Sequence, residues 1–201
     1  MSIDSMPKPR ETQHKAPPLG TGSGLVVRPG QAEDAATLSE VAYRSKAFWG
    51  YSSSLMAAFA AELTVSADQA AEAVVAEVDG VIAGFYLLGP ISGPIPATAS
   101  TGAGASQAGE LDMLFIDPTF IGAGVGRVLF HDAIAKAARR GWTSVFIAAD
   151  PQSVGFYETC GATQVGERMS ASVPGRFLPL LEKRLGALAG HAGGARATYW
   201  R

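Results

Sequence analysis

The chain has 201 residues, of which 47% are hydrophobic, so its length and composition suit one domain with a well-filled core and some residues left for tails. Its 16 Lys and Arg residues stand against 18 Asp and Glu residues, and the formal net charge of -2 gives no reason to expect a nucleic-acid partner. The only cysteine, Cys160, excludes intramolecular disulfides and cysteine-based metal clusters, so we expect no metal site.

The two ends of the chain differ in composition from the part between them. Residues 1–23 are rich in proline and nearly lack large apolar side chains, and residues 186–201 are dominated by glycine and alanine. Such segments cannot repay the entropy of ordering, so we expect a disordered N-terminal tail (1–23), one domain (24–185) and a flexible C-terminal tail (186–201). No apolar run could span a bilayer and the first residues do not resemble a signal peptide, so we expect a cytoplasmic protein without a membrane partner.

The domain begins with the pattern of a strand, a turn and a helix. Residues 25–28 predict the strand and 32–44 predict the helix, with a Pro-Gly turn between them. A second helix is expected at 52–63, where a serine is a suitable N-cap. Two aromatic residues, Trp49 and Tyr51, lie between the helices, and their rings belong either to the core or to the wall of a ligand cleft.

A β-hairpin is predicted next. Residues 73–78 and 81–88 are apolar runs joined by Asp-Gly, which is the strongest short-range signal for two adjacent antiparallel strands. Residues 89–109 carry many Gly, Ser, Ala, Thr and Pro residues and no charge, so they predict a flexible connection to the next strand.

A central strand is predicted at 110–116. Because side chains alternate along a strand, we expect two carboxylates, Glu110 and Asp112, on the same face. The alternation adds Leu114 to that face and assigns to the opposite face Leu111, Met113 and Phe115. Two carboxylates this close can raise one another's pKa, and either can attract an ammonium group or accept a proton. Asp112 can equally be a solvated side chain near a strand end.

Three glycines at alternate positions follow this strand, Gly122, Gly124 and Gly126. A helix predicted at 124–140 begins among them, so backbone N–H groups and the helix macrodipole can bind a phosphate or pyrophosphate there. The dinucleotide fingerprint would need glycine in place of Arg127, and the P-loop would need a Gly-Lys-Ser/Thr ending that this stretch lacks. The glycines alone are also compatible with a merely tight turn between strand and helix.

The glycine stretch resembles the pyrophosphate loop of the GCN5-related N-acetyltransferase (GNAT) family, whose pattern is Arg/Gln-x-x-Gly-x-Gly/Ala. The pattern covers residues 121–126, with Ile121 in the place of the usual Arg or Gln. A second stretch, 150–162, resembles the family's Asn-x-x-Ala-x-x-Phe/Leu-Tyr-Glu-Lys-x-Gly-Phe, with Asp150 for Asn and Ala162 for the last Phe. Its matching residues are Phe156, Tyr157, Glu158 and Gly161.

The resemblance extends from about residue 25 to residue 185 and implies a fold. The GNAT fold is a mixed α/β architecture, in which helices flank a mostly antiparallel central sheet and a strand-helix-strand crossover lies at the acyl-CoA site. A strand predicted at 143–148 would complete that crossover. Two further strands, predicted at 163–168 and 177–185, would close the sheet.

The resemblance also implies an activity and a cofactor. Family members move an acetyl group from acetyl-CoA to an amine by direct transfer in a ternary complex, so we expect acetyl-CoA as co-substrate and a small-molecule or amino-acid-like amine as acceptor. The cofactor-binding residues that it implies are Leu114, Phe115, Ile116, Gly122, Ala123, Gly124, Val125, Gly126, Arg127, Asp150 and Phe156. The departures at Ile121 and Asp150 keep a second function open, a non-catalytic acyl-CoA-binding or protein-interaction module on the same fold. A homodimer stays open as well.

The family mechanism implies roles on the acceptor side. Glu110 would accept the proton of the amine, directly or through water, and Tyr157 would donate a proton to the departing thiolate. With pKa values of about 10 for a phenol and about 8.5 for a thiol, that donation is only mildly uphill. Tyr157 can instead be a plain core aromatic. The link between the first two helices covers the acceptor cleft in the family, so Trp49 and Tyr51 join Asp112 as candidate substrate residues.

Overall fold

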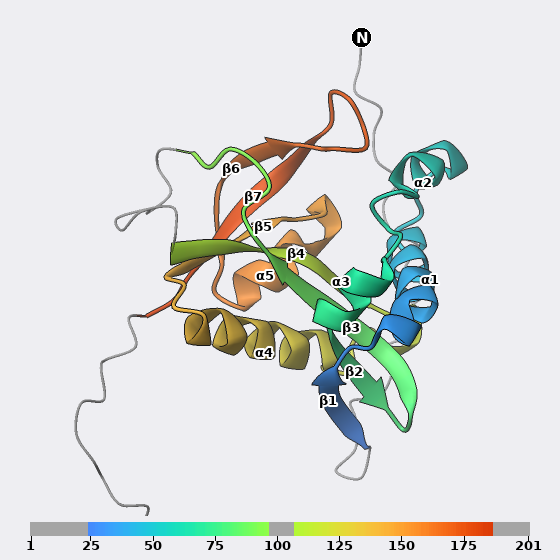
Figure 1. The fold of residues 1–201 in the computed structure, drawn as a ribbon. Coiled ribbons are helices and arrows are strands. Elements are labelled where there is room, and N and C mark those ends of the chain that lie inside the picture. Colours follow the sequence, from blue (N-terminus) through green and yellow to red (C-terminus); the bar gives the residue numbers. More distant parts are fainter. Residues whose placement is uncertain (1–23, 97–106, 187–201) are drawn as a thin grey trace, which may run out of the picture.

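The computed structural model describes residues 24–96 and 107–186, which build a seven-stranded sheet with helices on both faces (Figure 1). The strands are β1 (Leu25–Pro29), β2 (Val74–Val78), β3 (Val81–Gly89), β4 (Ala108–Ile116), β5 (Ser144–Ala148), β6 (Thr163–Met169) and β7 (Phe177–Arg184). The predicted tails, apart from Gly186, and the middle of the predicted 89–109 connection lie outside the described residues.

The sheet has the strand order β1-β2-β3-β4-β5-β7-β6. Strands β4 and β5 pair in parallel, and the other neighbouring pairs are antiparallel. Because a parallel pair needs a crossover, the chain passes from β4 to β5 through α4 (Val125–Arg139). The predicted fold class, a mostly antiparallel sheet with one strand-helix-strand crossover, is confirmed.

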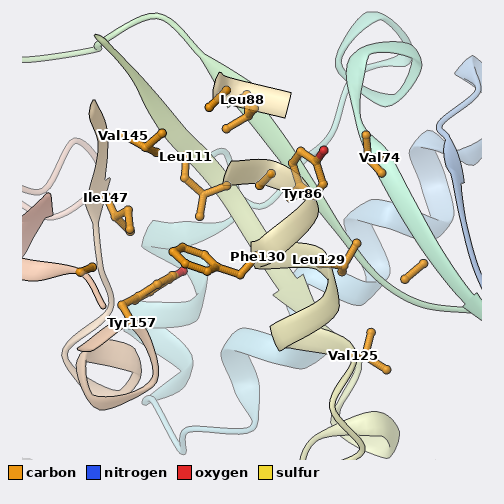
Figure 2. Close-up of a cluster of buried hydrophobic side chains, with 14 of the residues drawn as sticks. Val74, Tyr86, Leu88, Leu111, Val125, Leu129, Phe130, Val145, Ile147 and Tyr157 are labelled. Carbon is orange, nitrogen blue, oxygen red and sulfur yellow. The ribbon is translucent and has the colours of Figure 1, made fainter. Parts of the chain in front are cut away.

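Helices cover the two faces of the sheet and bury one core on each. On the first face lie α1 (Ala35–Ala47), α2 (Ser53–Phe59) and α3 (Ala67–Glu72), whose apolar side chains pack with Val75, Phe85 and Leu87 of the sheet. On the second face lie α4 and the short α5 (Val154–Thr159). Figure 2 shows this second core, in which Tyr86, Leu129, Phe130 and Val145 pack together.

Three short 3-10 turns complete the described elements, at Ala32–Asp34, Pro118–Phe120 and Pro151–Ser153. Helix α1 continues to Ala47, three residues beyond the predicted end, and Lys46 in its last turn is buried. Helix α3 was not predicted. It has only six residues, and its start is fixed by a capping box between Ser66 and Gln69.

A β-bulge in β4 changes the faces on which its side chains lie. Leu88 pairs with Leu111 and Leu87 pairs with Met113, so Asp112 is an extra residue without a partner in β3. The extra residue shifts the alternation, so Leu111 packs in the core beneath α4, as Figure 2 shows. Leu114 packs against the same core. Met113 and Phe115 pack in the core on the α1 face. The predicted grouping of Leu111 with Met113 and Phe115, and of Leu114 with the carboxylates, was wrong.

Strands β4 and β5 separate soon after they meet. Their parallel pairing covers Ala108–Glu110 opposite Ser144–Phe146, although β4 continues to Ile116 and β5 to Ala148. Beyond Glu110 the two strands therefore have no ladder between them. The loop that opens α4 follows the end of β4, and α5 follows the end of β5, so both lie at this separation.

Candidate active site

A cleft of about 450 Å³ opens where β4 and β5 separate, and we call it the glycine cleft. Residues from four parts of the chain form its wall. They are Ser45, Lys46 and Trp49 at the end of α1; Leu114, Phe115 and Ile116 of β4; Phe120, Ile121, Gly122, Gly124, Gly126 and Arg127 of the loop and first turn of α4; and Asp150, Gln152, Ser153, Phe156 and Tyr157.

The start of α4 is built to accept an anion. Gly124 is the N-cap residue with φ of 94°, Gly122 has φ of 86°, and both values lie in the left-handed region that favours glycine. The N-cap makes no side-chain hydrogen bond, so the N–H groups of the first turn keep no capping acceptor. Because these groups and the helix macrodipole face the cleft, a phosphate there would be favourably bound.

The predicted cofactor residues can now be compared with this cleft. All of them line it except two, Ala123 and Val125. The side chains of these two residues are buried in the core beneath the loop, where they anchor it. Ile121, which stands in the place of the family's Arg or Gln, also lines the cleft. Its apolar side chain leaves the backbone as the main source of hydrogen bonds at that position.

A second cavity of about 450 Å³ lies beyond the first, and we call it the carboxylate cavity. Its wall contains Glu110 and Asp112, together with Glu62, Ser92 and Arg168. The two cavities share six wall residues, Lys46, Leu114, Phe115, Asp150, Ser153 and Tyr157. A ligand in one cavity would therefore meet a ligand in the other beside these shared residues.

Tyr157 lies at this meeting point. Its ring is packed 5.8 Å from that of Phe130 and 5.1 Å from that of Phe156, as Figure 2 shows for Phe130. Burial raises the pKa of the phenol well above its ordinary value, and the charges of Asp150 and Cys160 add to the shift. Its hydroxyl makes no hydrogen bond to any residue that the structure describes. Tyr157 therefore keeps its proton at neutral pH and has it free to donate.

Asp150 connects three parts of the chain at the same place. Its carboxylate accepts hydrogen bonds from Lys46 Nζ at 2.8 Å and from the Tyr51 hydroxyl at 2.8 Å. Arg176 Nη2 lies 3.8 Å from the carboxylate and donates to the Tyr51 hydroxyl at 3.1 Å. Burial alone would raise the pKa of Asp150, but the Lys46 charge and the hydrogen bonds outweigh it, so the pKa is lowered. Asp150 is therefore an anion at neutral pH.

The two aromatic residues of the first connection lie in different surroundings. Trp49 lines the glycine cleft and not the carboxylate cavity. Tyr51 lines neither cavity and packs against Phe59, at 5.4 Å between ring centroids, while its hydroxyl binds Asp150. Tyr51 therefore does not line a cavity itself, but its hydroxyl helps to hold Asp150, which lines both cavities.

The two carboxylates of this cavity, Glu110 and Asp112, have different partners. Glu110 is buried, forms an ion pair with Arg168, and accepts hydrogen bonds from Ser92 N at 2.9 Å and Ser92 Oγ at 3.0 Å. Asp112 keeps part of its surface exposed and has no ion pair within the described ranges. Burial of its carboxyl raises its pKa, and the charge of Glu110 raises it further. Asp112 is thus more easily protonated than an ordinary aspartate.

Several side chains of the site could not be identified from the sequence. Lys46, Ser92 and Arg168 belong to no motif, and each reaches the site only through the tertiary fold. The predicted strand 163–168 contains two charged residues, Glu167 and Arg168, and the pattern alone does not say which of them faces the site. Arg176 also belongs to no motif, and it packs over Tyr51, with 5.4 Å between the guanidinium and the ring centroid.

The sequence matches the model of the Acetyltransferase (GNAT) family over residues 38–162. No curated protein matches the chain. A solved structure with a similar fold is the GCN5-related N-acetyltransferase of Rhodopseudomonas palustris, "Aminotransferase, Class-II", with a TM-score of 0.59 and 20% identity over 92% of this chain and 100% of that one. In the described residues, no helix has the length and apolar character needed to cross a membrane.

Two further solved structures carry the same fold. PaiA N-acetyltransferase from Thermoplasma acidophilum, in complex with coenzyme A, has a TM-score of 0.57 and 20% identity over 80% of this chain and 99% of that one. The ribosomal-protein-S18-alanine N-acetyltransferase of Escherichia coli has a TM-score of 0.55 and 17% identity over 85% of this chain and 99% of that one. At these identities the likeness establishes the fold.

Proposed function

The chain belongs to the acetyltransferase (GNAT) family, and from that membership we propose that it moves an acetyl group from acetyl-CoA to the amine of a small molecule by direct transfer. GNAT enzymes use acetyl-CoA as their acyl donor. In this proposal the donor occupies the glycine cleft and the acceptor occupies the carboxylate cavity. The single observation that carries it is that these two cavities adjoin and share six wall residues.

The residues of the glycine cleft suit coenzyme A. Its pyrophosphate would lie against the first turn of α4, where the uncapped N–H groups and the macrodipole favour negative charge. Gly126 lines the cleft without a side chain, so a ligand can approach the helix closely. Arg127 adds a positive charge at the same end of the helix. The apolar side chains of Leu114 and Ile116 would flank the arm that leads toward Tyr157.

The chemistry needs one proton to leave the acceptor and one to reach the departing sulfur. Bound acetyl-CoA supplies a thioester, whose C–S bond breaks as the amine nitrogen bonds to the carbonyl carbon. Tyr157 donates its phenolic proton to the sulfur and is later reprotonated, a role that its free hydroxyl at the shared wall supports. Burial raises the pKa of the phenol, so the proton stays on Tyr157 until the sulfur departs, and its transfer is more uphill than between groups of ordinary pKa. The wall that surrounds the nitrogen and the thioester holds both in reacting position, which supplies much of the rate.

A carboxylate takes the proton of the amine in this proposal. The family resemblance assigns that role to Glu110, and because both its oxygens are engaged by Arg168 and Ser92, it would act through a water molecule. Asp112 is the alternative, favoured by its raised pKa and its accessible carboxyl. The two assignments differ in their pH dependence and are separated by a test described below.

Two measurements on one preparation test the function. A calorimetric titration with acetyl-CoA should give one site per chain, and a screen of primary amines, scored by release of free CoA, should give acceptor-dependent turnover. Absence of acetyl-CoA binding in the folded protein would overturn the proposal. Binding without CoA release for any amine would favour the non-catalytic acyl-CoA-binding module.

A further inference from the structure

Arg168 of β6 has hydrogen-bond donors that the protein leaves unused. Its side chain lines the carboxylate cavity and is 9% exposed. Nη1 donates to Glu110 Oε1 and to Ser92 Oγ. Nε and Nη2 are buried and have no hydrogen-bond partner among residues 24–96 and 107–186. A buried guanidinium with unused donors is rare, because each unpaired donor is unfavourable in the folded state.

The two unused donors belong together. In a guanidinium, the Nε–H and one N–H of Nη2 lie side by side on the same edge and point in the same direction. This edge forms a planar fork whose spacing matches the two oxygens of a carboxylate, and such bidentate pairs are the strong form of the contact. Glu110 occupies only the Nη1 side. The structure therefore holds one complete carboxylate-binding edge without a partner.

The other charged residues of the cavity can also attract a cation. Lys46 is neutralised by Asp150, and Glu110 is neutralised by Arg168. Asp112 and Glu62 also line the cavity, and neither forms an ion pair with a described residue. Arg168, a wall residue of the cavity, thus keeps an unpaired edge that suits a negative group, and the free carboxylates suit a positive one. A ligand that satisfies both carries an ammonium group and a carboxylate.

We propose that the acceptor is an amino carboxylate, whose carboxylate binds Nε and Nη2 of Arg168 while its amine lies on the Asp112 side of the cavity. This inference rests on the proposed function and narrows its substrate class. The protein then selects its acceptor by the carboxylate, which takes no part in acetyl transfer, as well as by the amine. An amine of the same size without the carboxylate would leave the arginine edge unpaired and would bind poorly.

A spectroscopic test does not depend on activity. The Nε–H resonance of Arg168, assigned by comparison with the Arg168→Lys protein, is followed while glycine, β-alanine, L-alanine and L-phenylalanine are titrated in the presence of CoA. At least one acid should shift this resonance, and its carboxamide at the same concentration should not. An Nε–H resonance that no acid moves would overturn the inference.

A kinetic test uses the same pairs with acetyl-CoA. The preferred acid should exceed its carboxamide in kcat/KM by about 10²-fold or more, mainly through KM. Arg168→Lys keeps a positive charge beside Glu110 but lacks the fork, so it should lose most of this preference while its acetyl-CoA affinity is retained. The matched control is Arg184→Lys on the neighbouring strand β7, where the arginine side chain is 66% exposed and should leave the preference unchanged.

The outcomes separate the inference from the function on which it rests. Equal turnover of acids and carboxamides, with an unmoved Nε–H resonance, would overturn the inference and leave the acetyltransferase function standing. Acids that shift the resonance but release no CoA would support the carboxylate site and count against turnover. A preference for acids that survives in Arg168→Lys would also overturn the inference, because it would place the carboxylate elsewhere.

Discussion

The ammonium group of Lys46 lies 2.8 Å from the carboxylate of Asp150, although 104 residues separate them in the chain. Both side chains are nearly buried, at 10% and 12% exposure. Lys46 belongs to the last turn of α1 and Asp150 follows the end of β5, so this ion pair ties the helix to the sheet at the wall between the two cavities.

Asp150→Asn should destabilise the protein by about 3–5 kcal/mol, because it leaves the buried ammonium of Lys46 without its counter-charge. The double variant Lys46→Met/Asp150→Asn should recover part of that loss, and urea unfolding of the four proteins in the cycle measures the coupling. The exposed pair of Arg44 and Glu40 is the control, and Glu40→Gln should change the midpoint very little. Additive losses in the cycle would contradict the structural role of the pair.

The same ion pair predicts how stability depends on acid. The folded-state pKa of Asp150 is lower than its unfolded value, so its contribution is fully present above the unfolded value of about 4. The contribution is lost as pH falls through the lower, folded-state value. Wild type should therefore lose stability over this acidic range more steeply than Asp150→Asn, as measured by thermal melts at a series of pH values. Parallel curves for the two proteins would be inconsistent with the pair.

Gly126→Glu and Gly126→Gln differ in charge but hardly in size, and both add a side chain to the glycine cleft. A Cβ at this position would lie 3.5 Å from Ile116 and 3.6 Å from Phe156, so the fold can accept it. The glutamate should weaken acetyl-CoA binding by about tenfold more than the glutamine, because its charge competes for the helix N-terminus. The same charge should leave the melting temperature equal or higher.

The control for these variants is Gly155→Glu in the first turn of α5. Gly155 has open space around its Cβ position and does not line the glycine cleft. Acetyl-CoA affinity should stay at the wild-type level there. Calorimetric titrations of the four proteins decide the matter: equal affinities of Gly126→Glu and Gly126→Gln would argue against an anion at the start of α4.

Tyr157→Phe removes one hydroxyl and keeps the packing against Phe130 and Phe156. Because that hydroxyl has no hydrogen bond to a described residue, the variant should be nearly as stable as wild type. If Tyr157 protonates the departing sulfur, turnover should fall by about 10²- to 10⁴-fold while acetyl-CoA affinity is retained. Stopped-flow detection of free CoA measures the loss. Unchanged turnover on a verified acceptor would remove Tyr157 from the mechanism.

Asp112→Asn and Glu110→Gln separate the two candidate bases. Glu110→Gln removes a buried ion-pair partner of Arg168, so it should lower the melting temperature as well as turnover. Asp112→Asn removes a charge whose pKa is raised in the folded state. Stability from such a group is present below its unfolded pKa and is lost as pH rises through the folded value, so this variant should melt higher than wild type at pH 7 but not at pH 3.

The acidic limb of the pH–rate profile then identifies the base. If Asp112 accepts the proton, its Asn variant should lose that limb and most of its turnover. If Glu110 acts through water, Asp112→Asn should keep the acidic limb and its turnover. Glu110→Gln should then lose turnover even under conditions where it is fully folded. If both variants keep the acidic limb, neither carboxylate is the base, and the amine proton passes to water alone.

The glycine loop and the single strands could be predicted because their signals are local, whereas the arrangement of the whole sheet was predicted from the family resemblance. Alternate glycines before an amphipathic helix specify a turn and a helix N-terminus by themselves, and Asp79-Gly80 specifies a hairpin. Most strand limits were therefore close to those observed. The helix α3 was missed because six residues carry too little periodicity to be recognised.

The missing parts of the site depend on contacts between distant residues. The pair of Lys46 with Asp150 joins residues 104 positions apart, and the pair of Glu110 with Arg168 joins residues 58 positions apart. In neither pair can the partner be predicted from the residue types alone. The bulge in β4 was missed for another reason. Its residues alternate plausibly in two ways, and only pairing with β3 decides which one is used.

The bulge also affects how this protein can vary. If Asp112 were deleted from the chain, Glu110, Leu111 and Met113 would alternate as an ordinary strand, with Leu111 and Met113 still facing the cores that they fill now. A single codon could therefore be gained or lost at this position without a rearrangement of either hydrophobic core. The carboxylate of Asp112 could therefore be added to the cavity wall, or removed from it, without loss of the fold. Insertion or deletion at this position, as well as substitution, could change which acceptor the cavity binds.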